Sequence, residues 1–351
     1  MRPSLGTFDY IIVGAGSAGS VLAARLSDNG RFSVLLLEAG PSDRRFWIRT
    51  PLGYSRSYND AAVNWRYDSE PVEAFGGRTV YVPRGKVLGG SSSINALVYI
   101  RGHPSDYDDW ERLGNRGWGW RDVLPVYKRI EDHEFGASDW HGAGGPLRVS
   151  DFQGDAEPIC GAYYRAGGEA GVQLNRDFNG AAQEGVGPYQ ITVRDGIRAS
   201  ASRAYLWPAL KRKNLAVETV AQATRILFEG KRATGVEYRR GGRLVEAQAR
   251  REVILSAGAI NSPQLLLLSG IGDPTLLRRL GIQLLHEAPE VGRNLQDHLA
   301  YDHYYHANMG TLNDRLNSWI GQLFIGIQYV FFSSGPLSMS VNQAGGFVRT
   351  R

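Results

Sequence analysis

Residues 9–20 read DYIIVGAGSAGS, an apolar run followed by three closely spaced glycines. The apolar residues 10–13 predict a buried strand, and the small residues from 17 to 26 predict a helix. Gly14 allows a tight turn between them, Gly16 lets the backbone approach a phosphate, and Gly19 lets the helix pack closely on the strand. Because the helix N-terminus also offers free N–H groups to an anion, this stretch predicts a binding site for a dinucleotide pyrophosphate.

A second apolar run, residues 33–37, ends in Glu38. In a dinucleotide-binding βαβ unit, an acidic residue at about this distance meets a ribose hydroxyl. The glycines alone are also compatible with a purely structural turn. The full order of strand, turn, helix, strand and acid favours the dinucleotide site.

Length and composition narrow the class of protein. A chain of 351 residues exceeds the usual size of one domain, and 42% hydrophobic with 21% charged residues is typical of a globular protein. A net charge of +5 is too diffuse to predict nucleic-acid binding. Cys160 is the only cysteine, which excludes an internal disulfide and fits a reducing compartment. Since the N-terminus shows no apolar signal region, we expect a cytoplasmic protein.

The later part of the chain returns to strand-like patterns. Residues 215–220 and 223–228 predict strands, residues 235–239 and 243–248 a hairpin, and residues 252–255 another buried strand, followed by a helix at 263–268. We interpret this last strand and helix as a continuation of the nucleotide-binding sheet after an inserted lobe. The apolar stretch 319–332 is shorter than the roughly 18 residues of a membrane span. We expect it to form a mainly buried helix, with contact to a membrane surface as the minor alternative.

The histidines predict neither a metal site nor a catalytic base. His133 lies in the charged run 131–134, which indicates a solvated surface. His303 and His306 are typical of strand or surface positions, and His141 and His103 lie in turn-like contexts.

A second informative segment, residues 85–96, reads GKVLGGSSSINA. Paired glycines followed by serines let a backbone lie flat against a large ligand, although alone they favour a serine-rich turn. Residues 85–108 and 258–272 both resemble signature segments of the glucose-methanol-choline family of flavin oxidoreductases. Residues 291–298 and 335–349 are similar to further family segments, so the resemblance covers essentially the whole chain.

The resemblance implies an α/β fold in which a Rossmann-like FAD-binding domain is interleaved with an α+β substrate domain. We assign residues 1–135 and 196–300 to the FAD-binding domain, and residues 136–195 and 301–351 to pieces of the substrate domain. In the family, the catalytic histidine and its His or Asn partner lie in a segment beyond these residues. We therefore expect an incomplete substrate domain and name no catalytic residue.

The resemblance also implies FAD as the cofactor and supplies its contacts. Ile94 matches the position that holds a histidine in members with covalent flavin, so FAD is expected to bind non-covalently. The ADP half falls on Gly14, Gly16, Ser17, Ala18, Gly19, Glu38 and Ala39, with adenine at the backbone of Ala223. The flavin half falls on Val87, Gly90, Ser91, Asn95, Ala96, Leu97 and Val98.

The implied reaction is oxidation of an alcohol, in which a base takes the hydroxyl proton and hydride passes to flavin N5. Gln343 stands at a substrate-binding position where choline-oxidising members carry a glutamate, which argues against a quaternary ammonium substrate. We expect an uncharged primary alcohol, with a quinone, another carrier or oxygen as electron acceptor. A homodimer and peripheral membrane contact stay open.

Two alternatives remain. The chain is also compatible with a truncated flavin-binding or scaffold protein without turnover. The opening glycines alone also fit an NAD-dependent dehydrogenase, but the segments at 85 and 258 have no role in such an enzyme.

Overall fold

The sheet that contains the glycine turn begins with strand β1 (Ser4–Val13), followed by helix α1 (Ser17–Leu26) and strand β2 (Val34–Leu37). The computed structural model describes residues 4–151 and 156–349. β1 and β2 are parallel, and Val13 pairs with Leu37 at their carboxyl ends. The opening βαβ unit is therefore confirmed.

Six strands form this sheet in the order β12-β2-β1-β15-β14-β13. The added strands are β12 (Leu215–Glu218), β13 (Ala221–Glu229), β14 (Arg232–Arg240) and β15 (Arg243–Leu255). β15 lies beside β1 in parallel, with Leu255 opposite Val13, and forms the predicted hairpin with β14. The prediction of two separate strands at 243–248 and 252–255 was wrong. One strand runs through both because its first part pairs with β14 while most of its length pairs with β1.

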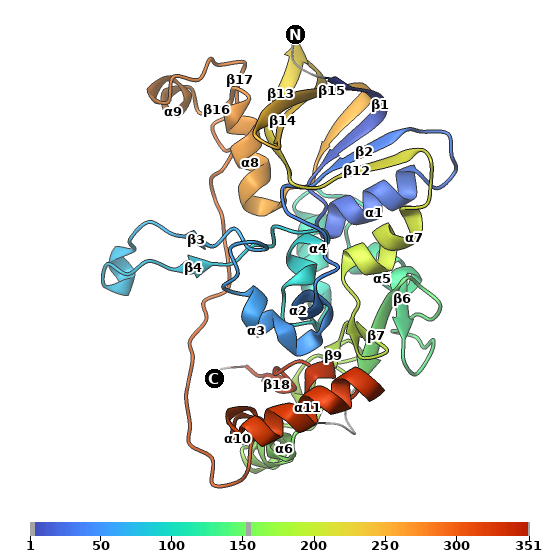
Figure 1. Ribbon diagram of the computed structural model, residues 1–351. Helices are drawn as coiled ribbons and strands as arrows, with labels where there is room; N and C mark the ends of the chain where they lie inside the picture. Colours follow the sequence, from blue (N-terminus) through green and yellow to red (C-terminus); the bar gives the residue numbers. More distant parts are fainter. Residues whose placement is uncertain (1–3, 152–155, 350–351) are drawn as a thin grey trace. The chain divides into compact units, whose positions relative to one another are not determined.

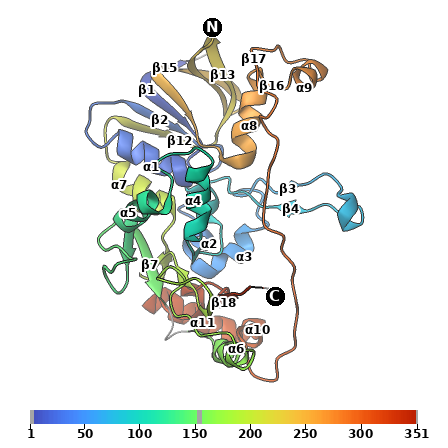
Figure 2. The ribbon, with the colours of Figure 1, turned by 180° about the vertical axis from the view of Figure 1, so that it is seen from behind.

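Alternating side chains of the sheet fill two cores. Ile12, Val34 and Leu36 face α1, whereas Ile11 and Leu35 face the side on which Leu265 of helix α8 (Gly258–Leu268) packs. Figures 1 and 2 show α1 and α8 on opposite sides of β1 and β15. This layering is what the two-residue period of a buried strand dictates.

Contacts between residues divide the chain into two units. The first contains residues 1–45, 57–94 and 201–303, and the second contains 46–56, 95–200 and 304–351. Both units are assembled from separated stretches of sequence. The assignment of the FAD-binding and substrate domains at residues 135, 195 and 300 remains a prediction.

The second unit has a four-stranded sheet in the order β5-β9-β7-β6. Figure 2 shows α4 and α5 of this unit side by side, as their contacts require. The strands and helices of this unit are β5 (Val98–Tyr99), β6 (Glu131–His133), β7 (Leu147–Asp151), β8 (Gly185–Pro188), β9 (Gln190–Ile191), β10 (Val193–Arg194), β11 (Ile197–Arg198), β18 (Ala344–Phe347), α2 (Phe46–Arg49), α4 (Pro104–Arg112), α5 (Trp120–Ile130), α6 (Pro158–Glu169), α10 (Leu312–Asn317) and α11 (Trp319–Phe332). The remaining short elements of the chain are α3 (Tyr54–Ser57), β3 (Tyr67–Asp68), β4 (Tyr81–Val82), α7 (Trp207–Ala209), β16 (Ile271–Gly272), α9 (Pro274–Arg279) and β17 (His286–Glu287).

Helix α11 has the predicted bounds but not the predicted burial. Only Ile325 and Tyr329 of its residues are buried. Phe324 is 67% exposed and Phe331 is 73% exposed, so the expectation of a mainly buried helix was wrong. The apolar composition of residues 319–332 correctly predicted the helix, but it carried no information about which neighbour covers it. Within the described residues, no helix is long and apolar enough to cross a membrane.

Candidate functional site

The glycine turn between β1 and α1 is closely packed at Gly14 and Gly19 and more open at Gly16. A Cβ on Gly14 would lie 2.6 Å from the carbonyl oxygen of Ser256, and one on Gly19 would lie 1.9 Å from the carbonyl oxygen of Gly14. Gly14 also has φ of +95°, which favours glycine. At Gly16 the nearest atom would be 3.9 Å away, so this position leaves the backbone accessible. The conformation of Gly14 and the close packing of Gly19 agree with the predicted tight turn, and the approach of a phosphate at Gly16 remains a prediction.

The serine-rich segment docks against this turn. The N–H of Gly89 donates to the carbonyl oxygen of Ala15 at 2.7 Å. A Cβ on Gly90 would lie only 2.7 Å from Cα of Gly16, and Gly90 has φ of +55°. The two glycine motifs, which lie about 75 residues apart in the sequence, thus touch through their backbones. Because Gly14, Gly16 and Gly90 have no side chains, their backbone is exposed along this wall of the site.

Glu38 anchors the turn from the end of β2. Its side chain is buried, Oε2 accepts the N–H of Ala15 at 2.9 Å, and Oε1 accepts the N–H of Gly40 at 2.9 Å. Burial raises the pKa of this carboxyl to about 7, against the opposing effect of the backbone donors. Because each carboxylate oxygen has two lone pairs, the side chain still has capacity to accept from a ribose hydroxyl.

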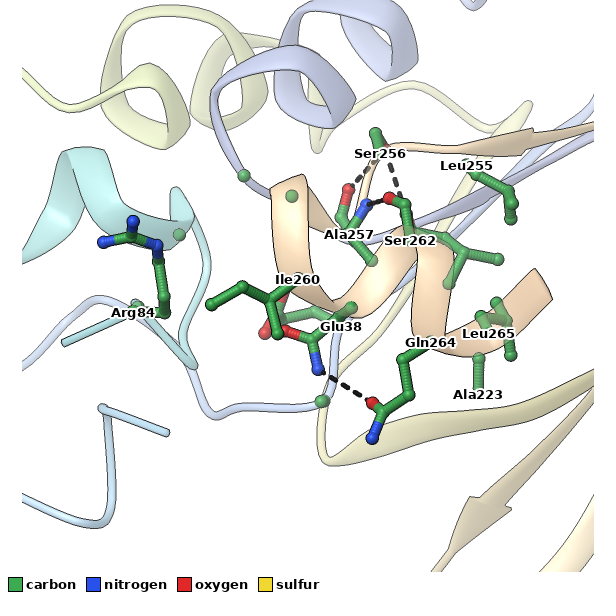
Figure 3. Close-up of a pocket in the computed structure, with 18 of the residues that line it drawn as sticks. Glu38, Arg84, Ala223, Leu255, Ser256, Ala257, Ile260, Ser262, Gln264 and Leu265 are labelled. Atoms are coloured by element: carbon green, nitrogen blue, oxygen red, sulfur yellow. Dashed lines mark hydrogen bonds between the residues drawn. The ribbon is translucent and has the colours of Figure 1, made fainter. Parts of the chain in front are cut away.

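A cavity of about 650 Å³ lies in the first unit at the carboxyl ends of β1, β2 and β15 (Figure 3). This edge of a parallel sheet is where nucleotides bind in doubly wound folds. Nine of the predicted cofactor residues line the cavity: Gly14, Gly16, Ser17, Ala18, Glu38, Ala39, Gly90, Ser91 and Ala223.

Two predicted residues of the first unit do not line the cavity. Gly19 lies under the turn against Gly14, and Val87 is fully buried. Their packing supports the walls of the cavity. Whether either one contacts a cofactor remains a prediction.

Sequence reasoning missed part of the lining. Arg84 and a run from Leu255 to Ser262 also border the cavity. Ser256 Oγ donates to the carbonyl oxygens of Val13 and Gly14, at 3.0 and 2.8 Å, and so fastens β15 to the glycine turn. The strand and turn predicted at 252–258 would have indicated these lining residues if that strand had been placed beside β1. Arg84 supplies a cation at the edge of the cavity, with Nη2 3.6 Å from the carboxylate of Asp297.

Four predicted flavin contacts, Asn95, Ala96, Leu97 and Val98, belong to the second unit. Asn95 is exposed, whereas Leu97 is 1% exposed and has φ of +66°, a left-handed conformation that costs a non-glycine residue energy. Val98 begins β5 and pairs with Ile191. Their role in cofactor binding stays a prediction.

Gln343, also in the second unit, is buried, with 4% exposure. Its Oε1 accepts the N–H of Glu157 at 2.7 Å and lies 3.7 Å from Cys160 Sγ. The amide oxygen therefore holds the start of α6. Its assignment to substrate binding remains a prediction.

The run at 131–134 is not the solvated surface that its charges indicated. Glu131 and His133 lie on β6 and are buried. Glu131 pairs with Arg101 at 2.9 Å and with His141 Nδ1 at 3.2 Å, while His141 Nε2 lies 2.9 Å from Asp177 Oδ2. Burial opposes protonation of His141, but its hydrogen bonds to Asp177 and Glu131 raise its pKa to about 9. The charges at 131–134 were satisfied by distant partners that the local pattern could not reveal.

None of the seven histidines, all of which lie in the described residues, borders the cavity of about 650 Å³. Across residues 4–151 and 156–349 there is also no group of three or more His, Cys, Asp or Glu side chains able to hold a metal ion. The cavity thus combines an anion-compatible backbone wall with few ionisable side chains.

Comparison with known proteins identifies the family. Residues 8–300 match the model of the GMC oxidoreductase family. The chain is 46% identical over 347 residues to alcohol dehydrogenase [acceptor] of Pseudomonas putida, covering 98% of this chain and 63% of the relative. It is 44% identical over 344 residues to oxygen-dependent choline dehydrogenase of Brucella suis biovar 1, covering 98% and 62%.

Solved structures agree with this result. Pyridoxine 4-oxidase from Mesorbium loti has a TM-score of 0.77 at 37% identity, covering 80% of this chain and 55% of that one. An FAD-dependent oxidoreductase from Chaetomium thermophilum has a TM-score of 0.86 at 29% identity, covering 96% and 61%. The chain thus spans less than two thirds of the length of these relatives. The resemblance and the fold class predicted from the sequence are confirmed, and this chain belongs to the GMC oxidoreductase family.

Proposed function

We propose that this chain holds FAD non-covalently and serves the oxidation of an uncharged primary alcohol to an aldehyde. Family membership supports FAD as the cofactor. The observation that carries the proposal is the backbone wall at which Gly16 and Gly90 meet, beside the N-terminus of α1. FAD, when bound, supplies the acceptor for the hydride of the alcohol.

The residues of the cavity fit the ADP half of this cofactor. Gly16 leaves room for a phosphate to reach the backbone, and α1 offers the unpaired N–H groups of its first turn. Arg84 adds a positive charge at the rim of the cavity. Glu38 retains lone pairs for ribose hydroxyls, and Ala223 borders the space proposed for adenine.

Non-covalent binding is proposed because Ile94 has no nucleophilic atom. Its side chain is also 5% exposed, so it packs into the protein. The test is to load the purified chain with FAD and then precipitate the protein with acid. We expect all flavin absorbance in the supernatant, whereas flavin that stays with the precipitate would contradict this part of the proposal.

The two dehydrogenases named above support an alcohol as the substrate, and the neutral Gln343 supports an alcohol without charge. The test is anaerobic mixing of the FAD-loaded full-length protein with a panel of primary alcohols and with choline, followed by bleaching of the flavin absorbance. We expect bleaching by uncharged alcohols and little by choline. Bleaching by choline alone would overturn the assignment of substrate, and no bleaching by any alcohol would overturn the proposed reaction.

A second candidate is a flavin-binding protein without turnover. Alcohol oxidation needs a base within hydrogen-bond reach of the hydroxyl, and none of the seven histidines of these 351 residues matches the family's catalytic histidine in the resemblance. We therefore propose that, in a protein of these 351 residues alone, every alcohol reduces the bound FAD only slowly. Turnover of the isolated chain at a rate typical of enzymes, roughly 1 to 1000 per second, would exclude this candidate.

A further inference from the structure

Helix α11 has two apolar sides, and the second unit covers only one of them. Ile325 and Tyr329 are buried, and the ring centre of Tyr329 lies 6.2 Å from that of Phe46 on α2. Seven apolar residues of the other side are exposed, by 43% to 74%: Trp319, Ile320, Leu323, Phe324, Ile327, Val330 and Phe331. At about 100° per residue, these seven lie within one arc of about 140°, opposite the two buried residues. We call these seven residues the outer arc of α11.

The outer arc offers almost nothing to a polar partner. Apart from the indole N–H of Trp319, no side chain in it can form a hydrogen bond. The two glutamines of the helix are occupied elsewhere: Gln322 Nε2 donates to the carbonyl oxygen of Leu316 at 2.6 Å, and Gln328 packs against Gly335. Protein–protein interfaces carry roughly one hydrogen bond per 100–200 Å². The composition of the outer arc therefore favours lipid acyl chains, which need no such bonds, over a protein surface.

The size of the outer arc also sets it apart from ordinary surface. Trp319, Phe324 and Phe331 are 74%, 67% and 73% exposed, so these three side chains alone present roughly 300 to 550 Å² of apolar area. The largest apolar patch of a typical monomer measures roughly 300 to 600 Å² in total, and four aliphatic side chains add to the area here. The helix of 14 residues is about 21 Å long, which is too short to cross a bilayer but long enough to lie along its surface.

The charges around α11 suit the headgroups of an anionic membrane. Residues 46–56, which include α2, and residues 315–349 contain four arginines and no Asp or Glu. Arg315 pairs with Glu157 and Arg349 with Glu184. The other two arginines are exposed: Arg49 belongs to α2, and Arg56 lies over the ring of Trp47 at 4.2 Å. This part of the second unit therefore has an excess of positive charge, which attracts anionic lipids.

We propose that the outer arc of α11 is a docking surface for a phospholipid bilayer. The helix lies in the plane of the membrane surface, its seven outer side chains enter the boundary between headgroups and acyl chains, and the indole N–H of Trp319 stays at the level of the headgroups. The inference does not depend on the FAD site or on the proposed reaction. It replaces the open question of membrane contact by a defined set of contact residues.

The test is co-sedimentation of the full-length protein with sucrose-loaded vesicles made of equal parts phosphatidylcholine and phosphatidylglycerol. Phe324→Gln and Phe331→Gln should each weaken vesicle binding by about tenfold, because each removes a ring that the bilayer would bury. The double variant should bind about a hundredfold more weakly. The matched control is Phe135→Gln in the turn after β6, where the side chain is 75% exposed but lies outside α11. That variant should bind within about twofold of the wild type.

A second measurement reports where α11 lies in the bilayer. Vesicles that contain phosphatidylcholine brominated on its acyl chains quench tryptophan fluorescence only where an indole ring reaches the lipid. We expect quenching of the wild-type protein. Trp319→Phe should remove most of that quenching while vesicle binding stays within about twofold, because phenylalanine keeps the apolar contact. This measurement decides the question if the glutamine variants fail to fold by circular dichroism.

Three results would overturn the inference. The first is a full-length protein that does not sediment with the vesicles. The second is binding or quenching that the substitutions at Trp319, Phe324 and Phe331 leave unchanged. The third is a lipid-free dimer that the double glutamine variant converts to a monomer, because a second copy of the chain would then cover the outer arc. None of these results bears on FAD binding, so the proposed function is tested separately.

Discussion

Replacing Gly19 by alanine gives the sharpest test of the glycine turn. The added Cβ would lie 1.9 Å from the carbonyl oxygen of Gly14 and 2.6 Å from Ser256 Oγ. Cβ atoms do not approach other heavy atoms closer than 3.0 Å, so the Gly14 oxygen must move by at least about 1.1 Å. Because that oxygen is backbone, the whole turn between β1 and α1 has to shift.

The expected cost is the difference between two terms. Overpacking of this kind costs about 3 kcal/mol at the upper end of the usual range. Alanine in place of glycine within a helix returns about 1 kcal/mol. We therefore expect Gly19→Ala to lower the free energy of unfolding by about 2 kcal/mol, roughly a thirtyfold change in the folded-to-unfolded ratio. FAD binding should weaken as well, because the N–H groups at the start of α1 move away from their places.

The assay is urea unfolding of the apoprotein, followed by circular dichroism, together with an FAD titration. The matched control is Gly168→Ala in α6, where a Cβ would meet nothing within 4 Å. That control should be neutral or stabilising by up to about 1 kcal/mol, with unchanged FAD affinity. A Gly19→Ala protein as stable as the wild type and with wild-type FAD affinity would refute the reasoning.

Three further predictions concern other parts of the chain. Glu38 has a pKa raised from 4.5 to about 7, so the stability it confers is complete below pH 4.5 and lost as the pH rises through 7. Urea unfolding of the apoprotein at a series of pH values should show this loss, on the order of 3 kcal/mol, and Glu38→Gln should abolish it. If the free energy of unfolding depended on pH equally in both proteins, the raised pKa of Glu38 would be contradicted. His141, with a pKa raised from 6.5 to about 9, should stay protonated at pH 8 in an NMR titration, whereas titration near 6.5 would mean that its two carboxylate contacts are not formed in solution. Phe324 and Phe331 lie on the exposed side of α11, so replacing either one by Gln should change the free energy of unfolding by less than about 0.5 kcal/mol. The same substitution should reduce binding of a hydrophobic dye. A loss of several kcal/mol would show that these side chains are covered in solution.

The sequence predicted best where the determining contacts are local. The tight bend at Gly14 and the packing of Gly19 on Gly14 are local and were predicted, whereas the packing of Gly14 against Ser256 depends on a distant strand. The pattern of strands at 215–255 was also predicted correctly, apart from the continuity of β15. That continuity depends on pairing with two neighbours, one of them near the N-terminus.

The sequence predicted poorly where a residue depends on distant partners. His141 looked like a turn residue, yet it joins Glu131 and Asp177 in a buried network. Apolar composition predicted helix α11, but whether a side chain is covered depends on a neighbouring surface, which composition does not encode.

The pairing of β1 with β15 also determines how late in synthesis the sheet can be completed. Val13 leaves the ribosome some 240 residues before its partner Leu255. At about 5 to 20 residues per second, this delay lasts roughly 12 to 50 seconds. Throughout that time the apolar edge of β1 has no permanent neighbour on that side, and pairing of such sequence-distant strands is slow in any case. We therefore expect the nascent chain to depend on chaperones until residue 255 has emerged, and the cavity at the carboxyl ends of β1 and β15 to be among the last parts of the first unit to form.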